Sequence, residues 1–133
     1  MTARPRTLTS ENTGLASPAG RHLLADLHGV DSPLLTDEAG LTDLLRRALD
    51  RAGFHVLGVR GHTFCGGGGG VTVMMLLSES HATVHTYPEN DYAAVDVFSC
   101  GSARPEDALE ALREELRPER VESTVHRRGG GRP

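Results

Sequence analysis

The sequence predicts an α+β fold of two layers, in which a mainly antiparallel sheet carries two helices packed on one face. Segments of strand type and helix type follow one another in the order β-α-β-β-β-β-α-β. Short turns join the strands in the middle of the chain, which favours antiparallel neighbours. Both predicted helices are amphipathic, so each needs a sheet face on which to bury its apolar side.

The first half of the chain begins with one strand and one helix. Residues His22–His28 are few and rich in apolar side chains, which is typical of a strand. Leucines and alanines then recur at helical spacing from Leu41 to Ala52. Thr36 or Asp37 can cap the start of this helix, and Gly53 stands where a C-terminal glycine is common.

The middle of the chain predicts a run of further strands. These are Phe54–Arg60, Val71–Leu77, His81–Tyr87 and Tyr92–Phe98. Val71–Leu77 is an unbroken apolar run, so we expect it at the centre of the sheet. The glycine run Gly66–Gly70 is predicted to be a mobile loop, and Pro88–Asp91 is predicted to be a turn.

A second helix and a last strand complete the predicted fold. Pro105 can begin a helix, and Pro118 stops it. The apolar face of this helix consists of Ala108, Leu109, Leu112 and Leu116. Val121–His126 is the predicted last strand.

Composition predicts one domain at residues 20–126, with a flexible extension at residues 1–19 and a flexible tail at residues 127–133, because both ends lack an apolar pattern. A net charge of −4 gives no basic surface for nucleic acid. No apolar run approaches the roughly 20 residues that span a bilayer, and no signal peptide is visible. Two cysteines, Cys65 and Cys100, do not make a disulfide framework, so a reducing cytoplasm is the expected compartment.

The chain contains no lysine, since all 14 of its Lys and Arg residues are arginine. Enzymes that use pyridoxal phosphate hold the cofactor through a lysine Schiff base. This chain therefore needs another electron sink if it performs chemistry on amines.

A serine beside a suitable carbonyl can supply such a sink from the backbone itself. The Ser80 hydroxyl lies next to the carbonyl of Glu79, so an N-to-O acyl shift can convert their amide to an ester. Elimination from the serine and hydrolysis then leave a pyruvoyl group at a new N-terminus. These steps need a proton shuttle within hydrogen-bond reach.

The residues around Ser80 form a long pattern with fixed spacing. The pattern consists of Ser78-Glu79-Ser80-His81, His85-Thr86, Pro88-Glu89, Tyr92-Ala93-Ala94-Val95-Asp96 and Cys100-Gly101. Gly20-Arg21-His22-Leu23 and His62-Thr63-Phe64 extend it toward the N-terminus. The pattern resembles the prokaryotic S-adenosylmethionine decarboxylase proenzymes, and the similarity spans about residues 20–126.

The resemblance implies that the chain cleaves itself between Glu79 and Ser80 and that Ser80 becomes the covalent pyruvoyl group. His85 is then the proton-transfer residue of this processing. Cys100 is the acid that protonates the decarboxylated carbon. Thr72 stands where the family usually has a serine that assists processing.

The resemblance also assigns the substrate site. Phe64 matches an aromatic residue that stacks on adenine, Glu89 matches an acidic residue near the substrate, and Ala82 stands where a larger apolar residue commonly lines the site. The implied reaction converts S-adenosylmethionine to its decarboxylated form and CO2, for spermidine synthesis. The implied assembly is a homodimer of cleaved protomers, with no nucleic-acid or membrane partner.

Three departures from the family leave the substrate open: the glycine-rich loop Cys65–Gly70, Ala82, and Tyr87 in place of a common tryptophan. The same chemistry on free arginine or ornithine is the first alternative, and a relative that never processes is the second. In a straight strand, Ser80 and His85 face opposite sides, so bringing them together needs a turn or bulge.

Two other kinds of site are weakly indicated. His62, Cys65, His81, His85 and Cys100 offer zinc ligands but lack the compact spacing of a zinc site. The glycine run lacks the Gly-Lys-Ser/Thr ending of a phosphate-binding loop and precedes a strand.

Overall fold

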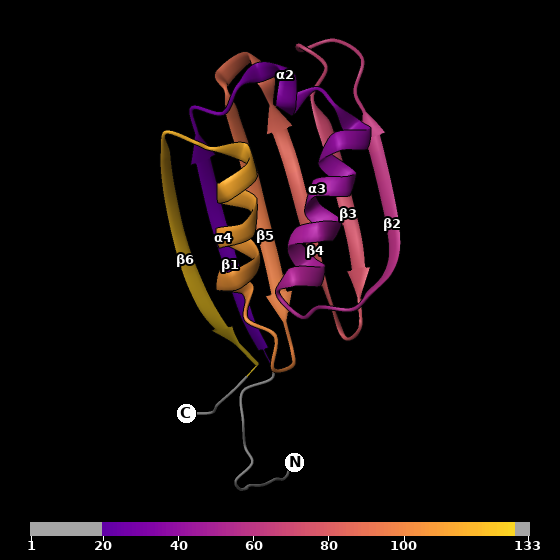
Figure 1. Ribbon diagram of the computed structural model, residues 1–133, viewed down its shortest axis with the longest axis vertical. Helices are drawn as coiled ribbons and strands as arrows, with labels where there is room; N and C mark the ends of the chain where they lie inside the picture. Colours follow the sequence, from indigo (N-terminus) through magenta and orange to yellow (C-terminus); the bar gives the residue numbers. More distant parts are fainter. Residues whose placement is uncertain (1–19, 130–133) are drawn as a thin grey trace, which may run out of the picture.

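The protein folds as two layers, a six-stranded antiparallel sheet and a layer of helices on one of its faces (Figure 1). This computed structural model describes residues 20–129. The strands are β1 (Gly20–His28), β2 (Val56–Thr63), β3 (Val71–Leu77), β4 (Ser80–Tyr87), β5 (Tyr92–Ser99) and β6 (Arg120–Arg128). The helices are α2 (Ser32–Leu35), α3 (Glu38–Arg51), α4 (Pro105–Leu116) and the short 3-10 helix η1 (Pro88–Asn90).

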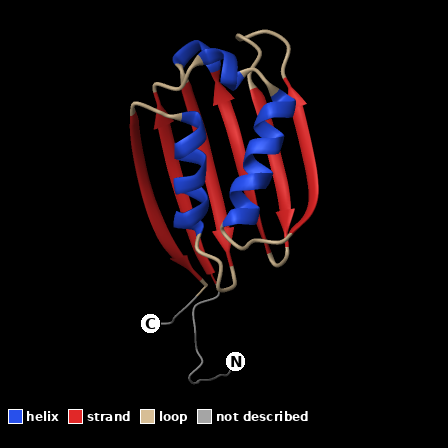
Figure 2. Ribbon diagram, viewed as in Figure 1, coloured by secondary structure: helices blue, strands red, loops and turns tan. Residues whose placement is uncertain are grey.

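The sheet has the strand order β2-β3-β4-β5-β1-β6, and each neighbouring pair is antiparallel. The first strand along the chain thus lies between β5 and β6, far from β2 in the sheet. Helices α3 and α4 lie side by side across the same face (Figure 2). The predicted fold class is confirmed.

Several element limits differ from the sequence prediction. Phe54 was expected in a strand, but it follows α3, where its N–H donates to the carbonyl of Leu49 in the last turn and its side chain is buried. Strand β6 was expected to end at His126 and runs on to Arg128, because its backbone pairs with β1 as far as Gly20. The short helix α2 was not predicted. The proposed extension and most of the proposed tail lie outside the described residues.

The core lies between the sheet and the helices. Alternate residues of the inner strands point to this side, among them Leu27, Val73 and Val95. Leu45 of α3 and Leu112 of α4 cover them and are both fully buried. Each such side chain contributes roughly 1.5–3 kcal/mol by leaving water. Packing on the sheet therefore holds both helices in place.

Helix α3 has the ends that the sequence predicted. The Asp37 side chain accepts a hydrogen bond from the Gly40 N–H at 3.0 Å, which satisfies a free donor of the first turn. Gly53 follows the helix with a φ of 91°, a conformation that favours glycine.

The opposite face of the sheet, which we call the open face, is not covered by any element between residues 20 and 129. Large apolar side chains are exposed on it, with Leu24 at 43%, Met74 at 54% and Leu76 at 60%. Apolar patches of this kind mark sites of interaction. None of the helices in the described range is long and apolar enough to cross a membrane.

Candidate active site

Ser80 lies at the tip of the hairpin that joins β3 and β4. Leu77 pairs with Ser80, so Ser78 and Glu79 form a two-residue turn. Glu79 has a φ of 66°, in the left-handed region that costs a non-glycine residue about 1–2 kcal/mol. Glu79 is exposed and Ser80 is half-buried. The peptide bond predicted to be cleaved therefore follows a strained, accessible residue.

Thr72 and His85 form a second part of the candidate site. They are register partners on β3 and β4, and both side chains lie on the open face. The Thr72 Oγ1 atom lies 2.5 Å from His85 Nδ1. A half-buried imidazole held by a hydroxyl is fit to carry a proton, because its other nitrogen stays available.

Phe64 and the glycine loop lie beside this pair. The Phe64 ring centroid is 6.0 Å from that of His85. Beyond Phe64, the loop residues Gly66, Gly67, Gly68 and Gly69 all have φ between 59° and 86°. Only glycine adopts such a series readily, so the sequence of this loop determines its shape.

The glycine loop also approaches Glu89 of η1. A Cβ added to Gly68 would lie 3.4 Å from Glu89 Oε1, and one added to Gly70 would lie 2.8 Å from the carbonyl oxygen of Thr86. The loop therefore packs directly over the end of β4. Phe64, Thr72, His85 and Glu89 gather at the end of the sheet that carries α2, at the top of Figure 1.

Cys100 lies at the other end of the sheet, with Ser80. It follows the last residue of β5 and is exposed. His81 pairs with Phe98, and one further step in this register places Ser80 beside Ser99, next to Cys100. The candidate residues thus form two groups, Ser80 with Cys100 at the hairpin end and Thr72 with His85 at the α2 end.

The two groups are separated within one chain. Strand β4 pairs without a register shift on both sides, so no bulge brings Ser80 toward His85. Five residues of strand span about 17 Å. The two side chains also start from opposite faces, as the alternation of the sequence indicated.

Ala82, which was predicted to line the substrate site, lies in the core. Ala82 has 0% exposure and points into the core beneath the helices, on the face opposite His85. Even-numbered residues of β4 pack inward there, so Ala82 does not line the open face. Its small size is explained by the core.

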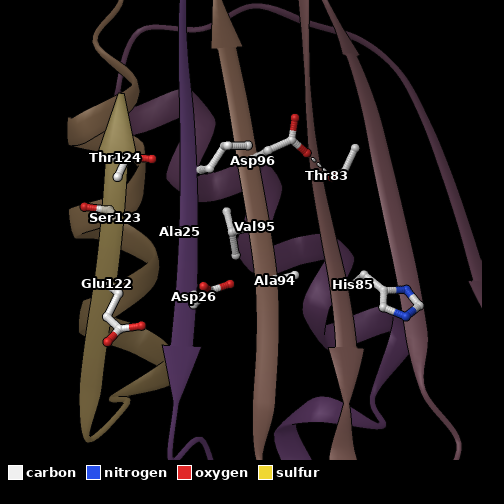
Figure 3. A pocket seen from close by; sticks show the side chains of 11 residues that line it. Ala25, Asp26, Thr83, His85, Ala94, Val95, Asp96, Glu122, Ser123 and Thr124 are labelled. Atoms are coloured by element: carbon white, nitrogen blue, oxygen red, sulfur yellow. Dashed lines mark hydrogen bonds between the residues drawn. The ribbon is translucent and has the colours of Figure 1, made fainter. Parts of the chain in front are cut away.

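Sequence reasoning missed several polar contacts on the open face. A hollow of about 650 Å³ runs across β4, β5, β1 and β6, reaches His85, and includes Asp26, Asp96 and Glu122 (Figure 3). The Tyr92 hydroxyl donates to Asp26 Oδ1 at 2.5 Å. Burial raises the pKa of Tyr92 to about 12, and this hydrogen bond acts in the same direction. The signal available in the sequence was the alternation along each strand, which puts Asp26, Asp96 and Glu122 on one face of the sheet.

Potential metal ligands gather in a different way from the sequence hypothesis. Among the described residues, two groups bring three ligand atoms within 4.8 Å of one another. They are His22, His81 and Asp96, and Asp26, His28 and Glu122. Neither group contains Cys65, His85 or Cys100. The set considered from sequence therefore does not form one site.

The chain is similar to proteins of one family over most of its length. The family whose sequence pattern matches residues 21–129 is S-adenosylmethionine decarboxylase. The S-adenosylmethionine decarboxylase proenzyme of Pyrobaculum aerophilum is 41% identical over 104 residues, which cover 77% of this chain and 82% of that protein. The arginine decarboxylase proenzyme of Ignicoccus hospitalis is 46% identical over 101 residues, or 75% of this chain and 70% of that protein.

A solved structure shares the architecture. The crystal structure of adenosylmethionine decarboxylase from Aquifex aeolicus superposes with a TM-score of 0.79 at 33% sequence identity. The match covers 86% of this chain and 93% of the other. The likeness thus extends over sheet and helices together.

Proposed function

We propose that this chain, which belongs to the S-adenosylmethionine decarboxylase family, is a self-processing pyruvoyl-dependent decarboxylase that acts on S-adenosylmethionine. The observation that carries the proposal is the left-handed Glu79 immediately before Ser80, in a two-residue turn. Residues in this conformation cluster at functional sites, although ordinary turns and helix ends also use it, as at Arg117. Here the strain lies at the bond that processing breaks.

In the proposed maturation, Ser80 Oγ attacks the carbonyl carbon of Glu79 and the amide becomes an ester. Transfer of the Ser80 α-proton to a base eliminates the Glu79 carboxylate, and residues 1–79 become a separate chain that stays paired in the sheet. The remaining dehydroalanine takes up water and releases ammonia. His85, whose ring is held by Thr72, is the proton-transfer residue in these steps.

The residues present fit a pyruvoyl group at position 80. Ser80 is the first residue of β4, so cleavage frees a chain end without removing a residue from inside a strand. When formed, the group supplies the electron sink that the lysine-free chain cannot hold as pyridoxal.

The remaining residues bind the substrate and move one proton. Cys100 donates a proton to the carbon that has lost CO2. Phe64, 45% exposed, offers a ring face for a flat base and for a sulfonium cation. Glu89 offers a carboxylate to hydroxyl groups or positive charge nearby.

We further propose that the active form is a homodimer that closes over the open face. A two-fold axis that packs two open faces together can place the hairpin end of one copy against the α2 end of the other. Ser80 and Cys100 of one copy then meet Thr72 and His85 of the second. The exposed Leu24, Met74 and Leu76 support such packing, because they become buried in it. We assign the enzyme to the cytoplasm, where both cysteines stay reduced.

Intact-mass spectrometry of the purified chain tests self-processing. We expect two fragments that divide between Glu79 and Ser80, and a blocked N-terminus on the smaller one. Ser80→Ala should give one full-length chain, and Cys100→Ala should cleave but turn over poorly. A single uncleaved wild-type chain would instead favour a non-processing relative.

Arginine is the second candidate substrate, because the relative from Ignicoccus hospitalis is 46% identical and is named an arginine decarboxylase proenzyme. CO2 release from S-adenosylmethionine, arginine and ornithine separates the candidates. Release from arginine alone would replace the first substrate and leave the processing chemistry in place.

A further inference from the structure

Three strands bring His22, Asp96 and His81 together on the open face. Phe98 of β5 pairs with His22 of β1 on one side and with His81 of β4 on the other, and Asp96 lies two residues before it. Asp96 Oδ2 is 2.7 Å from His22 Nε2 and 3.4 Å from His81 Nε2. All three ligand atoms lie within 4.8 Å of one another.

We propose that His22, His81 and Asp96 bind a divalent transition-metal ion of the zinc type. Two imidazole nitrogens and one carboxylate oxygen are a donor set that borderline ions such as Zn²⁺ accept at about 2.0–2.2 Å. Mg²⁺ and Ca²⁺ prefer oxygen ligands, and this site offers one carboxylate. In the single chain a fourth position faces solvent, since His81 is 47% exposed there.

The three side chains are held close to the arrangement that an ion requires. Thr83 Oγ1 donates to Asp96 Oδ1, which leaves Oδ2 to face the two imidazoles. The Phe98 ring packs against both imidazoles, with centroid distances of 5.1 Å to His22 and 5.6 Å to His81. Supporting contacts of this kind orient metal ligands and raise affinity.

Arg128 competes with the ion for His22. Its Nη1 atom lies 2.9 Å from His22 Nδ1, and a guanidinium can only donate. His22 Nδ1 therefore accepts, so Nε2 carries the hydrogen and donates to Asp96. An ion at Nε2 needs the other tautomer, whose Nδ1–H would face the guanidinium. Binding thus requires Arg128 to turn away, and removal of Arg128 should strengthen it.

This site is distinct from the residues assigned to processing. His81 follows Ser80 in sequence, but its side chain points to the open face, away from the direction in which Ser80 starts. None of the three ligands is Thr72, His85 or Cys100. Metal binding can therefore be measured on the uncleaved Ser80→Ala chain, and its outcome does not depend on decarboxylase activity.

Calorimetric titration of Zn²⁺ into the full chain, stripped of metal with a chelator, tests the proposal. We expect about one ion per chain, on both wild type and Ser80→Ala. His22→Ala, His81→Gln and Asp96→Asn should each lose affinity by more than the roughly 10–100-fold that removal of a supporting group costs. Thr83→Val should fall within that range, and Arg128→Ala should bind more tightly than wild type.

Three controls address other sources of binding. His55→Ala removes an exposed histidine outside the cluster and should leave the titration unchanged. A Cys65→Ser, Cys100→Ser double variant should also bind normally, and Mg²⁺ should not compete at equal concentration. Retained affinity in His81→Gln, whose side chain is 47% exposed, overturns the proposal, and so does loss of binding in the cysteine variant. Circular dichroism confirms that each variant is folded.

Discussion

The division of the candidate site between two ends of the sheet predicts complementation between two inactive variants. In Ser80→Ala the proposed pyruvoyl precursor is missing, and in His85→Ala the proposed proton-transfer residue is missing. Within one chain the two positions lie about 17 Å apart along β4, too far for direct proton transfer. If a second copy supplies His85, a mixed dimer contains one intact site and one site with both defects.

The expected magnitude follows from this arrangement. In the intact site of a mixed dimer, Ser80 belongs to the His85→Ala chain and His85 belongs to the Ser80→Ala chain. Random pairing of equal amounts makes about half of all dimers mixed. About half of the His85→Ala chains should therefore cleave, and no Ser80→Ala chain should do so.

Co-expression of the two variants with different tags makes this measurement direct. Intact mass of each purified chain gives the cleaved fraction. Co-expression with a Ser80→Ala, His85→Ala double variant is the matched control and should add nothing. If His85→Ala cleaves no more with its partner than alone, then the split site is refuted, whether or not the chain dimerises.

Three further predictions test residues near the site. Thr86 is buried, and its hydroxyl accepts a hydrogen bond from the Val71 N–H and donates one to the Leu35 carbonyl. Thr86→Val should therefore lower the free energy of unfolding, measured in urea, by about 2–4 kcal/mol. A loss below about 1 kcal/mol would contradict this. Thr72→Val should slow cleavage by about 10²-fold, and Thr72→Ser should not, because only the serine keeps a hydroxyl for His85. Equal cleavage rates in the valine and serine variants would show that this hydrogen bond plays no part in processing. In the Tyr87→Phe variant, absorbance should report a pKa for Tyr92 well above 10, near 12. Stability should be lost as pH rises through that range, since the folded state holds the Tyr92 proton more tightly than the unfolded state. Titration of Tyr92 near pH 10 would contradict the raised pKa.

Most of the fold could be predicted because its signals are local. Apolar runs and helical spacing are properties of short segments, so Val71–Leu77 and the helix that begins at Pro105 were placed correctly. Phe54 was misassigned because an apolar residue after a helix packs equally well in a strand or against the helix end. The position of β1 between β5 and β6 has no local signal, since it depends on contacts far apart in sequence.

The site was predicted as a set of residues but not as an arrangement. Ser80 and His85 are near in sequence and belong to one motif, yet the regular β4 strand keeps them apart. The opposite holds for His22 and Asp96, which are 74 residues apart and touch. The regular pairing of β4 determines the first outcome, and strand order, which a single sequence does not reveal, determines the second.

The strand order also explains how the two fragments would stay associated after cleavage between Glu79 and Ser80. Residues 1–79 carry β1, β2 and β3, and residues 80–133 carry β4, β5 and β6. Of the five strand pairings, β3–β4, β5–β1 and β1–β6 join the two fragments, and α3 packs on α4 across the same division. Because β1 lies between two strands of the other fragment, neither piece can leave without opening the centre of the sheet. The proposed cleavage would thus release a strained turn and leave the scaffold of the site intact.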